Sequence, residues 1–318
     1  MKQRLETFDI ARALCIVLVV IGHYNPDNAP MWWKNVNHFI YSFHMPVFLF
    51  ISGFIYAFSI KKGNYLSFIW KKVKRLLLPY LTASIIVVGI KLLTQGFSYV
   101  ENPVEIDTFI KIFYLPAAGY YLWFVWALFI MFAITQLCSS RRAHILLLLV
   151  STILYFSPNT FPNVFCLKEF QKMWVFFMLG VVLFELQIYH IFHTKWFWSA
   201  AIVLYIVAYS TFTADANWQQ LIVAISGIGM ILSIASIISA FFWLKEQIIL
   251  RIATSSYTIY LYHTTCSGFA KAALAKISLP DTLFVCGAIL VVICGLIIPL
   301  CVHHLIKKTQ MLKWTIGL

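Results

Sequence analysis

The sequence predicts an all-α protein that crosses a membrane many times. Hydrophobic residues make up 62% of the 318-residue chain and charged residues only 11%, a composition far outside that of soluble domains. Long apolar runs recur from end to end, whereas a transmembrane β-barrel would show short segments of alternating polarity. No polar stretch is long enough to form a soluble domain. We therefore expect a single transmembrane domain over residues 1–318.

Ten transmembrane helices account for the apolar runs, taken in order from the N-terminus. We expect them at residues 8–24, 36–60, 76–95, 120–138, 143–156, 173–190, 196–212, 220–243, 253–274 and 282–304. The first run is a retained helix and not a signal peptide, because Glu6 and Asp9 intrude and no small-residue cleavage site follows. The second contains Pro46, which frees a backbone carbonyl one turn earlier and bends the helix.

Short motifs and prolines delimit the later spans. The third span follows the basic stretch KKVKR, the fourth begins with YYLWFVWAL, the sixth contains WVFFMLG and the ninth contains SSYTIYLYH. The other spans are defined by length and hydropathy alone. Prolines punctuate the ends of several spans, at Pro79, Pro116, Pro158, Pro162, Pro280 and Pro299.

The charges between the spans predict that both termini face the cytoplasm. With the N-terminus inside, 17 of the 24 lysines and arginines fall on the inner side, together with four of the 11 acids. The outer segments hold six basic and seven acidic residues, and Lys91 lies near the outer end of the third span. This positive-inside bias supports ten spans. The net charge of +13 then attracts anionic lipid headgroups, while the absence of a basic polar face of domain size excludes nucleic acid as a partner.

The first span carries three ionisable residues on one face. His23 follows Arg12 by eleven positions, which is about three helical turns and roughly 16 Å along the axis. Asp9 precedes Arg12 by three positions and falls on the same side. Ionisable residues inside a membrane are costly and mark functional sites, so we hypothesise that all three are catalytic. The structural alternative is that Asp9 and Arg12 pair at the cytoplasmic interface while His23 reaches the outer headgroups.

A further histidine, His44, lies early in the second span, six residues after His38. A short outer connection joins the first two spans, so His23 and His44 can approach each other in the outer half of the bilayer. We therefore include His44 among the candidate catalytic residues. Interfacial anchoring beside aromatic residues is the alternative for this side chain.

The stretch KKVKRLLLPY before the third span offers a cytoplasmic site for phosphates. Lys72 and Arg75 are three positions apart and can point together into a vestibule. A topology signal without a binding role is the alternative for this cluster.

The ninth span presents a continuous polar stripe. Ser256, Tyr260, His263 and Ser267 are spaced by four, three and four residues, which places them on one helix face. His263 lies roughly 15 Å from the cytoplasmic end, near the middle of the bilayer. The stripe can contribute to a site or can serve only in hydrogen bonding between packed helices.

Other chemistries find little support in the sequence. The histidine pairs at 190 and 193 and at 303 and 304 have no cysteine or carboxylate that completes a ligand set, so we predict no metal site. There is no GxSxG elbow of a serine hydrolase and no Walker pattern of a nucleoside triphosphatase.

Several motifs occur in a fixed order along the whole chain. Arg12 and His23 lie in FDIARALCIVLVVIGH, which is followed by FHMPVFLFISGF and KRLLLPY, and then by the less specific YYLWFVWAL, WVFFMLG and SSYTIYLYH. With these motifs in this order, the chain resembles the acyltransferase-3 family of integral membrane acyltransferases. The resemblance is greatest to the branch of sugar O-acetylases of the fucose 4-O-acetylase type.

The resemblance implies an inner-membrane enzyme that takes an acyl group, usually acetyl, from cytosolic acyl-coenzyme A. The acceptor it implies is a hydroxyl of a cell-surface glycan or a lipid-linked sugar. His23 matches the family's catalytic histidine and Arg12 its basic partner. Lys72 and Arg75 match a pair of arginines that hold coenzyme A; here lysine keeps the charge of the first but lacks its bidentate fork.

The residues suit such a reaction. Acyl transfer to a hydroxyl needs a general base near the accepting oxygen and donors for the developing oxyanion. Neutral His23 can abstract the hydroxyl proton or relay the acyl group as a nucleophile, and His44 or His263 can supply a second proton function. The phosphates of acetyl-coenzyme A would meet the basic cluster, with the pantetheine arm reaching past Tyr260 and His263 towards His23.

Two other functions also fit the sequence. Ten helices with an intramembrane Asp-Arg-His chain would suit a proton-coupled transporter of a small solute or glycan precursor. Few acids at mid-span and no visible internal repeat count against a transporter. A flippase or polymerase-associated scaffold without chemistry of its own is the third interpretation.

Overall fold

The computed structural model describes residues 2–59, 63–98, 100–212, 216–241, 246–275 and 283–317, and these residues form helices and connecting turns without any strand. The α-helices, in chain order, are α1 (Lys2–Gly22), α2 (Met31–Tyr41), α3 (His44–Ser59), α4 (Tyr65–Lys72), α5 (Leu78–Thr94), α6 (Thr108–Lys111), α7 (Trp123–Thr135), α8 (Arg141–Phe156), α9 (Leu167–Glu185), α10 (Lys195–Thr211), α11 (Asn217–Phe241), α12 (Glu246–Ala275) and α13 (Phe284–Lys308). A π-helix, η1 (Val73–Leu77), links α4 to α5, and the short 3-10 helices are η2 (Tyr120–Leu122), η3 (Ile188–His193) and η6 (Gln310–Ile316).

The helices confirm the all-α class, and each of the ten predicted spans overlaps a helix of the described residues. Within the described residues, four helical segments are long and apolar enough to cross a membrane, namely Met31–Ser59, Tyr65–Thr94, Asn217–Phe241 and Phe284–Lys308. The chain is therefore a multi-pass helical membrane protein, while the count of ten spans and the cytoplasmic side of the termini stay predictions. Span residues 60, 242, 243 and 282 lie outside the described residues, as do the charged residues at 61, 62, 215, 245, 276 and 281.

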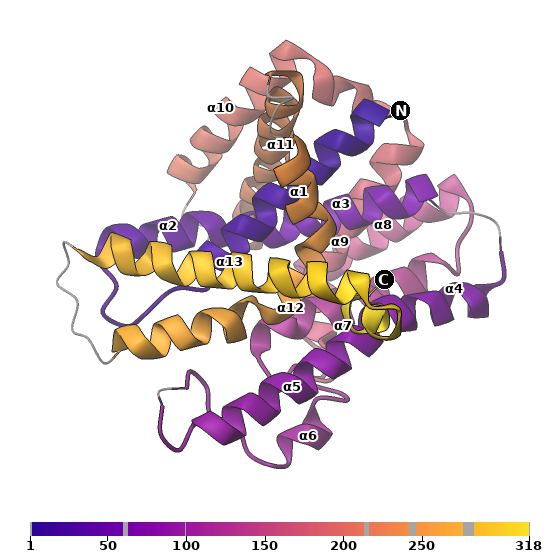
Figure 1. Cartoon of the computed structure of the whole chain (residues 1–318). Coiled ribbons are helices and arrows are strands. Elements are labelled where there is room, and N and C mark those ends of the chain that lie inside the picture. Colours follow the sequence, from indigo (N-terminus) through magenta and orange to yellow (C-terminus); the bar gives the residue numbers. More distant parts are fainter. Residues whose placement is uncertain are drawn as a thin grey trace.

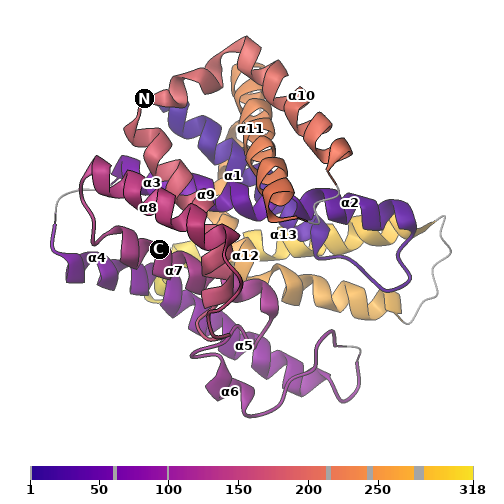
Figure 2. The same ribbon diagram turned by 180° about the vertical axis from the view of Figure 1, so that it is seen from behind.

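Both termini lie towards the same side of the bundle, as an even number of crossings requires (Figures 1 and 2). On that side the C-terminal η6 packs against η1 and α5. The connection that leaves α1 lies at the opposite end of that helix (Figure 1).

Helix α1 lies at the centre of the bundle. It packs against α2, α3, α11, α12 and α13, and Ala11, Cys15 and Ile16 on its surface are fully buried. Small and aliphatic side chains along the helix allow this approach from several sides. Its last residue, Gly22, is therefore held inside the protein, and so is His23, which follows it.

The second predicted span is broken into two helices. α2 ends at Tyr41 and α3 begins at His44, with Pro46 in the first turn of α3. A proline cannot donate to the carbonyl four residues earlier, here that of Ser42, which favours a kink or break in the helix at this point. The predicted bend at Pro46 is thus confirmed, and it places His44 at the start of a helix.

The helices α3 and α9 approach each other closely at two glycines. A Cβ at Gly53 would lie 1.9 Å from the carbonyl oxygen of Phe177, and a Cβ at Gly180 would lie 2.1 Å from that of Phe50. Because backbone lies on both sides of this contact, no side-chain movement can make room for even one methyl group. The contact at Gly53 and Gly180 holds α9 against α3, the helix that begins with His44.

We expect Gly180→Ala to destabilise the protein by about 1–3 kcal/mol or more, because overpacking must push α3 and α9 apart. The thermal midpoint of the detergent-solubilised protein, followed by fluorescence-detected size exclusion, measures this effect. The matched control is Gly89→Ala in α5, where an added Cβ meets nothing within 4 Å. Alanine is the better helix former, so this variant should be as stable as the wild type or slightly more stable. Equal loss of stability in both variants would contradict the packing described.

Candidate functional site

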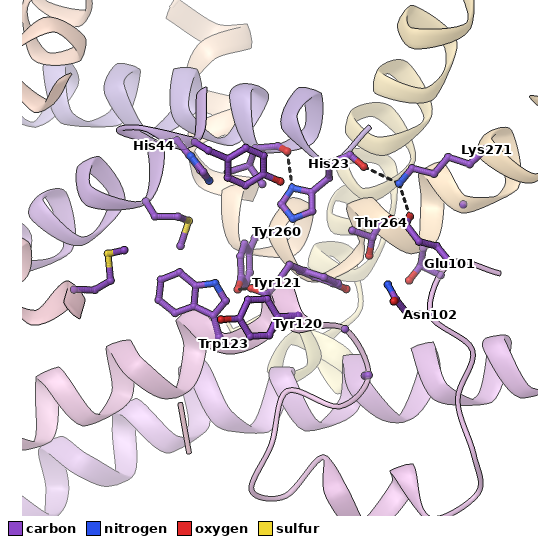
Figure 3. A pocket seen from close by; sticks show the side chains of 18 of the residues that line it. His23, His44, Glu101, Asn102, Tyr120, Tyr121, Trp123, Tyr260, Thr264 and Lys271 are labelled. Carbon is purple, nitrogen blue, oxygen red and sulfur yellow. Dashed lines mark hydrogen bonds and ion pairs between the residues drawn. The ribbon is translucent and has the colours of Figure 1, made fainter. Parts of the chain in front are cut away.

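A cavity of about 930 Å³ lies between α1, α3, α5, α9, α11 and α12. Aromatic and aliphatic side chains make up most of its wall, together with amides and charged groups. His23 and His44 lie on one side of it, and Lys271, Glu101 and Asn102 lie together at one end (Figure 3). A largely apolar cavity with a few convergent polar groups is the form that small-molecule sites usually take.

His23 presents one free ring nitrogen to this cavity. Its Nδ1 lies 2.8 Å from the carbonyl oxygen of Val19, one turn earlier in α1. A carbonyl can only accept, so Nδ1 carries the proton and donates it to Val19. In the neutral ring Nε2 is then unprotonated and basic, and it points away from Val19 into the cavity (Figure 3).

Aromatic rings surround the His23 imidazole on several sides. The ring of His263 lies 4.8 Å from it between centroids, that of Tyr121 5.8 Å and that of Tyr41 6.2 Å. The first two contacts are edge-to-face, the arrangement that aromatic pairs prefer. These rings restrict the movement of the imidazole, and those of Tyr41 and Tyr121 belong to the cavity wall.

The same tautomer is found at His44 and His263. His44 donates from Nδ1 to the carbonyl of Ile40 at 2.8 Å, is buried, and lines the same cavity as His23 (Figure 3). His263 donates from Nδ1 to the carbonyl of Tyr260 at 2.8 Å, and its fully buried Nε2 has no hydrogen-bond partner. An unpartnered buried nitrogen beside the His23 ring is unusual, because buried polar atoms are generally paired.

Of the predicted polar stripe on α12, Tyr260 reaches the cavity wall. Its hydroxyl donates to the carbonyl of Tyr121, and the rings of these two tyrosines lie 5.9 Å apart. Ser256 and Ser267 are buried on the same face of the helix, as the spacing predicts. The stripe therefore both packs the helices and contributes to the site.

Asp9 and Arg12 are not in the cavity. The Arg12 guanidinium donates to the Asp9 carboxylate within α1, and each side chain is about 30% exposed, as the structural alternative in the sequence predicts. The Nε of Arg12 is buried without a partner. Arg12 and His23 lie on one helix face, yet the cavity reaches only His23.

Lys72 and Arg75 lie away from the cavity, at the start of the third predicted span. The π-helix η1 begins immediately after Lys72 and widens the turn between the two residues. The Lys72 ammonium lies 3.5 Å from the centroid of the Phe132 ring, a cation–π contact, whereas Arg75 is exposed. The two side chains thus have different environments and do not form the shared vestibule that their spacing suggests.

Two charged residues of the site escaped the sequence analysis. Lys271 donates from Nζ to the carbonyl oxygen of His23 at 2.7 Å and to the Glu101 carboxylate at 2.8 Å. In the predicted topology, Lys271 and Glu101 fall among the charged residues of the outer segments. Lys271 continues the α12 stripe by four residues beyond Ser267, a signal that would have found it. Nothing in the sequence indicates that Glu101 lies beside it.

The described residues contain no group of three or more histidine, cysteine, aspartate or glutamate side chains that could hold a metal ion. The loop residues in the cavity wall, among them 97–98, Glu101, Asn159 and Asn217, belong to connections that the charge pattern predicts on the outer side. We therefore expect the cavity to open to the outer face.

Comparison with known proteins identifies a family match. The family described as an acyltransferase domain matches residues 5–304 of the chain. No solved structure matches it.

Two curated relatives are similar to parts of the chain, and both are named nodulation protein NolL. The one from Mesorhizobium japonicum is 29% identical over 164 residues, which is 48% of this chain and 42% of the relative. The one from Sinorhizobium fredii is 30% identical over 138 residues, which is 41% of this chain and 36% of the relative. The chain thus spans about two fifths of the length of the curated relatives it matches.

A cysteine placed in the cavity tests which face it opens to. Gly268 lines the cavity, and an added Cβ there meets nothing within 4 Å. In a background without the seven native cysteines, we expect Gly268→Cys to react with a membrane-impermeant thiol reagent added outside intact cells. Gly89→Cys in α5, which also has open space around it, lies outside the cavity wall and should stay unlabelled. Labelling of Gly268→Cys only from the cytoplasmic side would contradict the predicted orientation.

Proposed function

The chain belongs to the acyltransferase-3 family, and from this membership we propose that it is a membrane-bound O-acyltransferase. In this proposal it moves an acetyl group from cytosolic acetyl-coenzyme A to a hydroxyl of a cell-surface glycan or lipid-linked sugar. The observation that carries the proposal is the His23 imidazole, whose Nδ1 is occupied by Val19 and whose Nε2 is free at the cavity wall. This is the form that a general base takes.

In the reaction that we propose, His23 acts on the acceptor. Nε2 takes the proton of the attacking hydroxyl, the new ester C–O bond forms, and the C–S bond of the thioester breaks. The proton on His23 then goes to the sulfur of coenzyme A, which leaves as the thiol. Atoms and charge balance without a metal or a redox partner.

His44 is well placed for a second polar role. It is buried on the same cavity wall, its Nδ1 is occupied by Ile40, and its Nε2 can accept a hydrogen bond from the acceptor. The ring of Tyr41 contacts both imidazoles, at 6.2 Å from His23 and 5.0 Å from His44 between centroids, so His44 would bind a second polar group of the acceptor and help to orient it for attack. The ring of His263 lies behind His23 and contacts the His23 ring. It would therefore influence the charge of the His23 imidazole when that ring takes up the proton.

A line of tyrosines supports a route for the donor. The hydroxyl of Tyr257 donates to the carbonyl of Leu76 at 2.7 Å, directly after Arg75. One turn along α12, the ring of Tyr260 is stacked on that of Tyr257 at 6.4 Å and lines the cavity. The basic end of the third predicted span and the cavity are thus separated by about one helical turn of α12. We propose that the pantetheine arm follows this line of rings to His23.

The phosphates of coenzyme A would bind at the basic end of this route. Arg75 is exposed and its guanidinium can hold a phosphate with two parallel hydrogen bonds. The Lys72 ammonium, which lies over the Phe132 ring, would add positive charge at this end of the route. Anionic coenzyme A does not cross a membrane, so this end must face the cytoplasm. That is the side on which the charge pattern predicts Lys72 and Arg75, and it supports a location in the cytoplasmic (inner) membrane.

The first test removes the general base. We expect His23→Ala to lower the transfer of label from radiolabelled acetyl-coenzyme A to the glycan and lipid-linked sugar fraction of membranes by 10²-fold or more. The matched control is His38→Ala, which removes an exposed histidine bonded to Tyr209 outside the cavity and should leave the rate unchanged. A His23→Ala protein that transfers acetyl at the wild-type rate overturns the mechanism. A wild-type protein that moves a labelled solute but no acetyl group would identify a transporter.

The second test addresses donor binding. We expect Arg75→Ala to raise the KM for acetyl-coenzyme A on the order of tenfold or more while kcat changes little, because charged hydrogen bonds to phosphate are lost. Lys74→Ala is the control, since the Lys74 ammonium lies over the Trp70 ring at 5.4 Å and we assign it no phosphate. If the KM for acetyl-coenzyme A changed equally in both variants, Arg75 would have no specific role in phosphate binding, and the basic cluster would serve only as a topology signal.

A further inference from the structure

The C-terminal end of α1 is capped by side chains from other parts of the bundle. Three consecutive carbonyl oxygens, those of Gly22, His23 and Tyr24, each accept a hydrogen bond from a side chain. The donors are Tyr41 Oη to Gly22 at 3.3 Å, Lys271 Nζ to His23 at 2.7 Å, and Trp33 Nε1 and Asn37 Nδ2 to Tyr24 at 2.6 and 3.3 Å. Helix ends leave such carbonyls without partners inside the helix, so they need donors from outside.

Lys271 differs from the other three donors because it is charged and comes from a distant helix. Its side chain is only 13% exposed, and it lies on the cavity wall beside His23 (Figure 3). A cation at a helix C-terminus is favoured by the helix dipole. Desolvating an ammonium still requires partners, which here are the His23 carbonyl and the Glu101 carboxylate.

The hydrogen bonds of His23 fix the imidazole from two directions. Its backbone N–H donates to Val19 at 3.1 Å and its Nδ1–H donates to the same oxygen at 2.8 Å. On the other side of the residue, Lys271 fixes the carbonyl and therefore the peptide plane. The two backbone hydrogen bonds, from the N–H to Val19 and from Lys271 to the carbonyl, together hold the backbone on both sides of Cα and so the Cα–Cβ bond. The Nδ1–H bond to Val19 then sets the direction in which Nε2 points.

We propose that Lys271 is a positioning residue that orients His23 for acyl transfer through its hydrogen bond to the His23 carbonyl. Glu101 acts as the counterion of Lys271 and does not hold His23 itself. This inference rests on the proposed function, because it assigns Lys271 a role in the reaction of His23. It requires that the ammonium donate to the carbonyl, and an ion pair with Glu101 alone does not suffice.

A competing role for Lys271 is purely structural, and we call it a latch. Glu101 is 56% exposed and belongs to the connection between α5 and α6, so the ion pair could serve only to hold this connection against α12. The two roles make different demands. A latch needs opposite charges at the two positions in either order, whereas positioning needs a hydrogen-bond donor at position 271.

Four variants, assayed with radiolabelled acetyl-coenzyme A and membranes as acceptor source, separate the two roles. We expect Lys271→Met to lower kcat on the order of 10–100-fold with the KM for acetyl-coenzyme A within about twofold, because the base is misaligned and the donor site is intact. Lys271→Arg keeps a donor and should restore most of kcat. Glu101→Gln keeps the bond to His23 and should stay within about threefold of wild type. Lys271→Glu combined with Glu101→Lys restores opposite charges without a donor at 271 and should remain as slow as Lys271→Met.

The matched control is Lys111→Met, which removes another lysine–carboxylate pair, to Asp107 at 2.6 Å, on the protein surface. It should leave kcat unchanged. A folded Lys271→Met protein with wild-type kcat overturns the proposal, and so does recovery of kcat in the charge swap.

Hydrogen–deuterium exchange provides a readout that does not depend on activity. Without Lys271 as donor, the peptide that contains residues 19–29 should exchange faster in Lys271→Met than in the wild type or Lys271→Arg. Unchanged exchange together with unchanged kcat would assign Lys271 no role at His23. Faster exchange in a protein whose wild-type form transfers no acetyl group would instead overturn the proposed function and leave the structural bond to His23 intact.

Discussion

The constraint on which this structure depends is the need to satisfy backbone polar groups at a helix end that lies inside the protein. α1 is packed by five other helices and ends next to a cavity, so its last carbonyls cannot rely on bulk water. The solution is a set of donor side chains from α2 and α12. Because His23 is the residue at this end, the same hydrogen bonds that complete the helix also fix the position of the imidazole.

This arrangement links packing to chemistry. Three histidines have Nδ1 occupied by a backbone carbonyl that lies three or four residues earlier in the chain, so in the neutral state each keeps Nε2 as the acceptor. The tautomer that a general base requires is thus set locally, by a carbonyl three or four residues earlier. Which helices face one another decides only which Nε2 atoms reach the cavity, and these are the ones on His23 and His44. His263 keeps the same tautomer but is enclosed behind His23.

Two local departures from regular helix lie at the two ends of the proposed site. The break before Pro46 places His44 at the start of α3, and the glycine contact between α3 and α9 keeps that helix close to the cavity. At the other end, the π-helix after Lys72 exposes the Leu76 carbonyl to Tyr257. Irregular backbone in membrane helices is tolerated only where other groups satisfy it, which here is the tyrosine of α12.

The sequence by itself determined the helical class, the helices under the predicted spans and the family, because hydropathy, proline and motif order are local properties of the chain. It also placed Tyr260 and Ser267 correctly on one helix face, since helical periodicity fixes faces. Only the tertiary structure decided that Arg12 pairs with Asp9 away from the cavity, that Lys72 rests on Phe132, and that Lys271 meets Glu101 and the His23 carbonyl. The physical reason is that a helix face does not specify its partner: residues 170 positions apart meet only once the packing of α1, α5 and α12 is fixed.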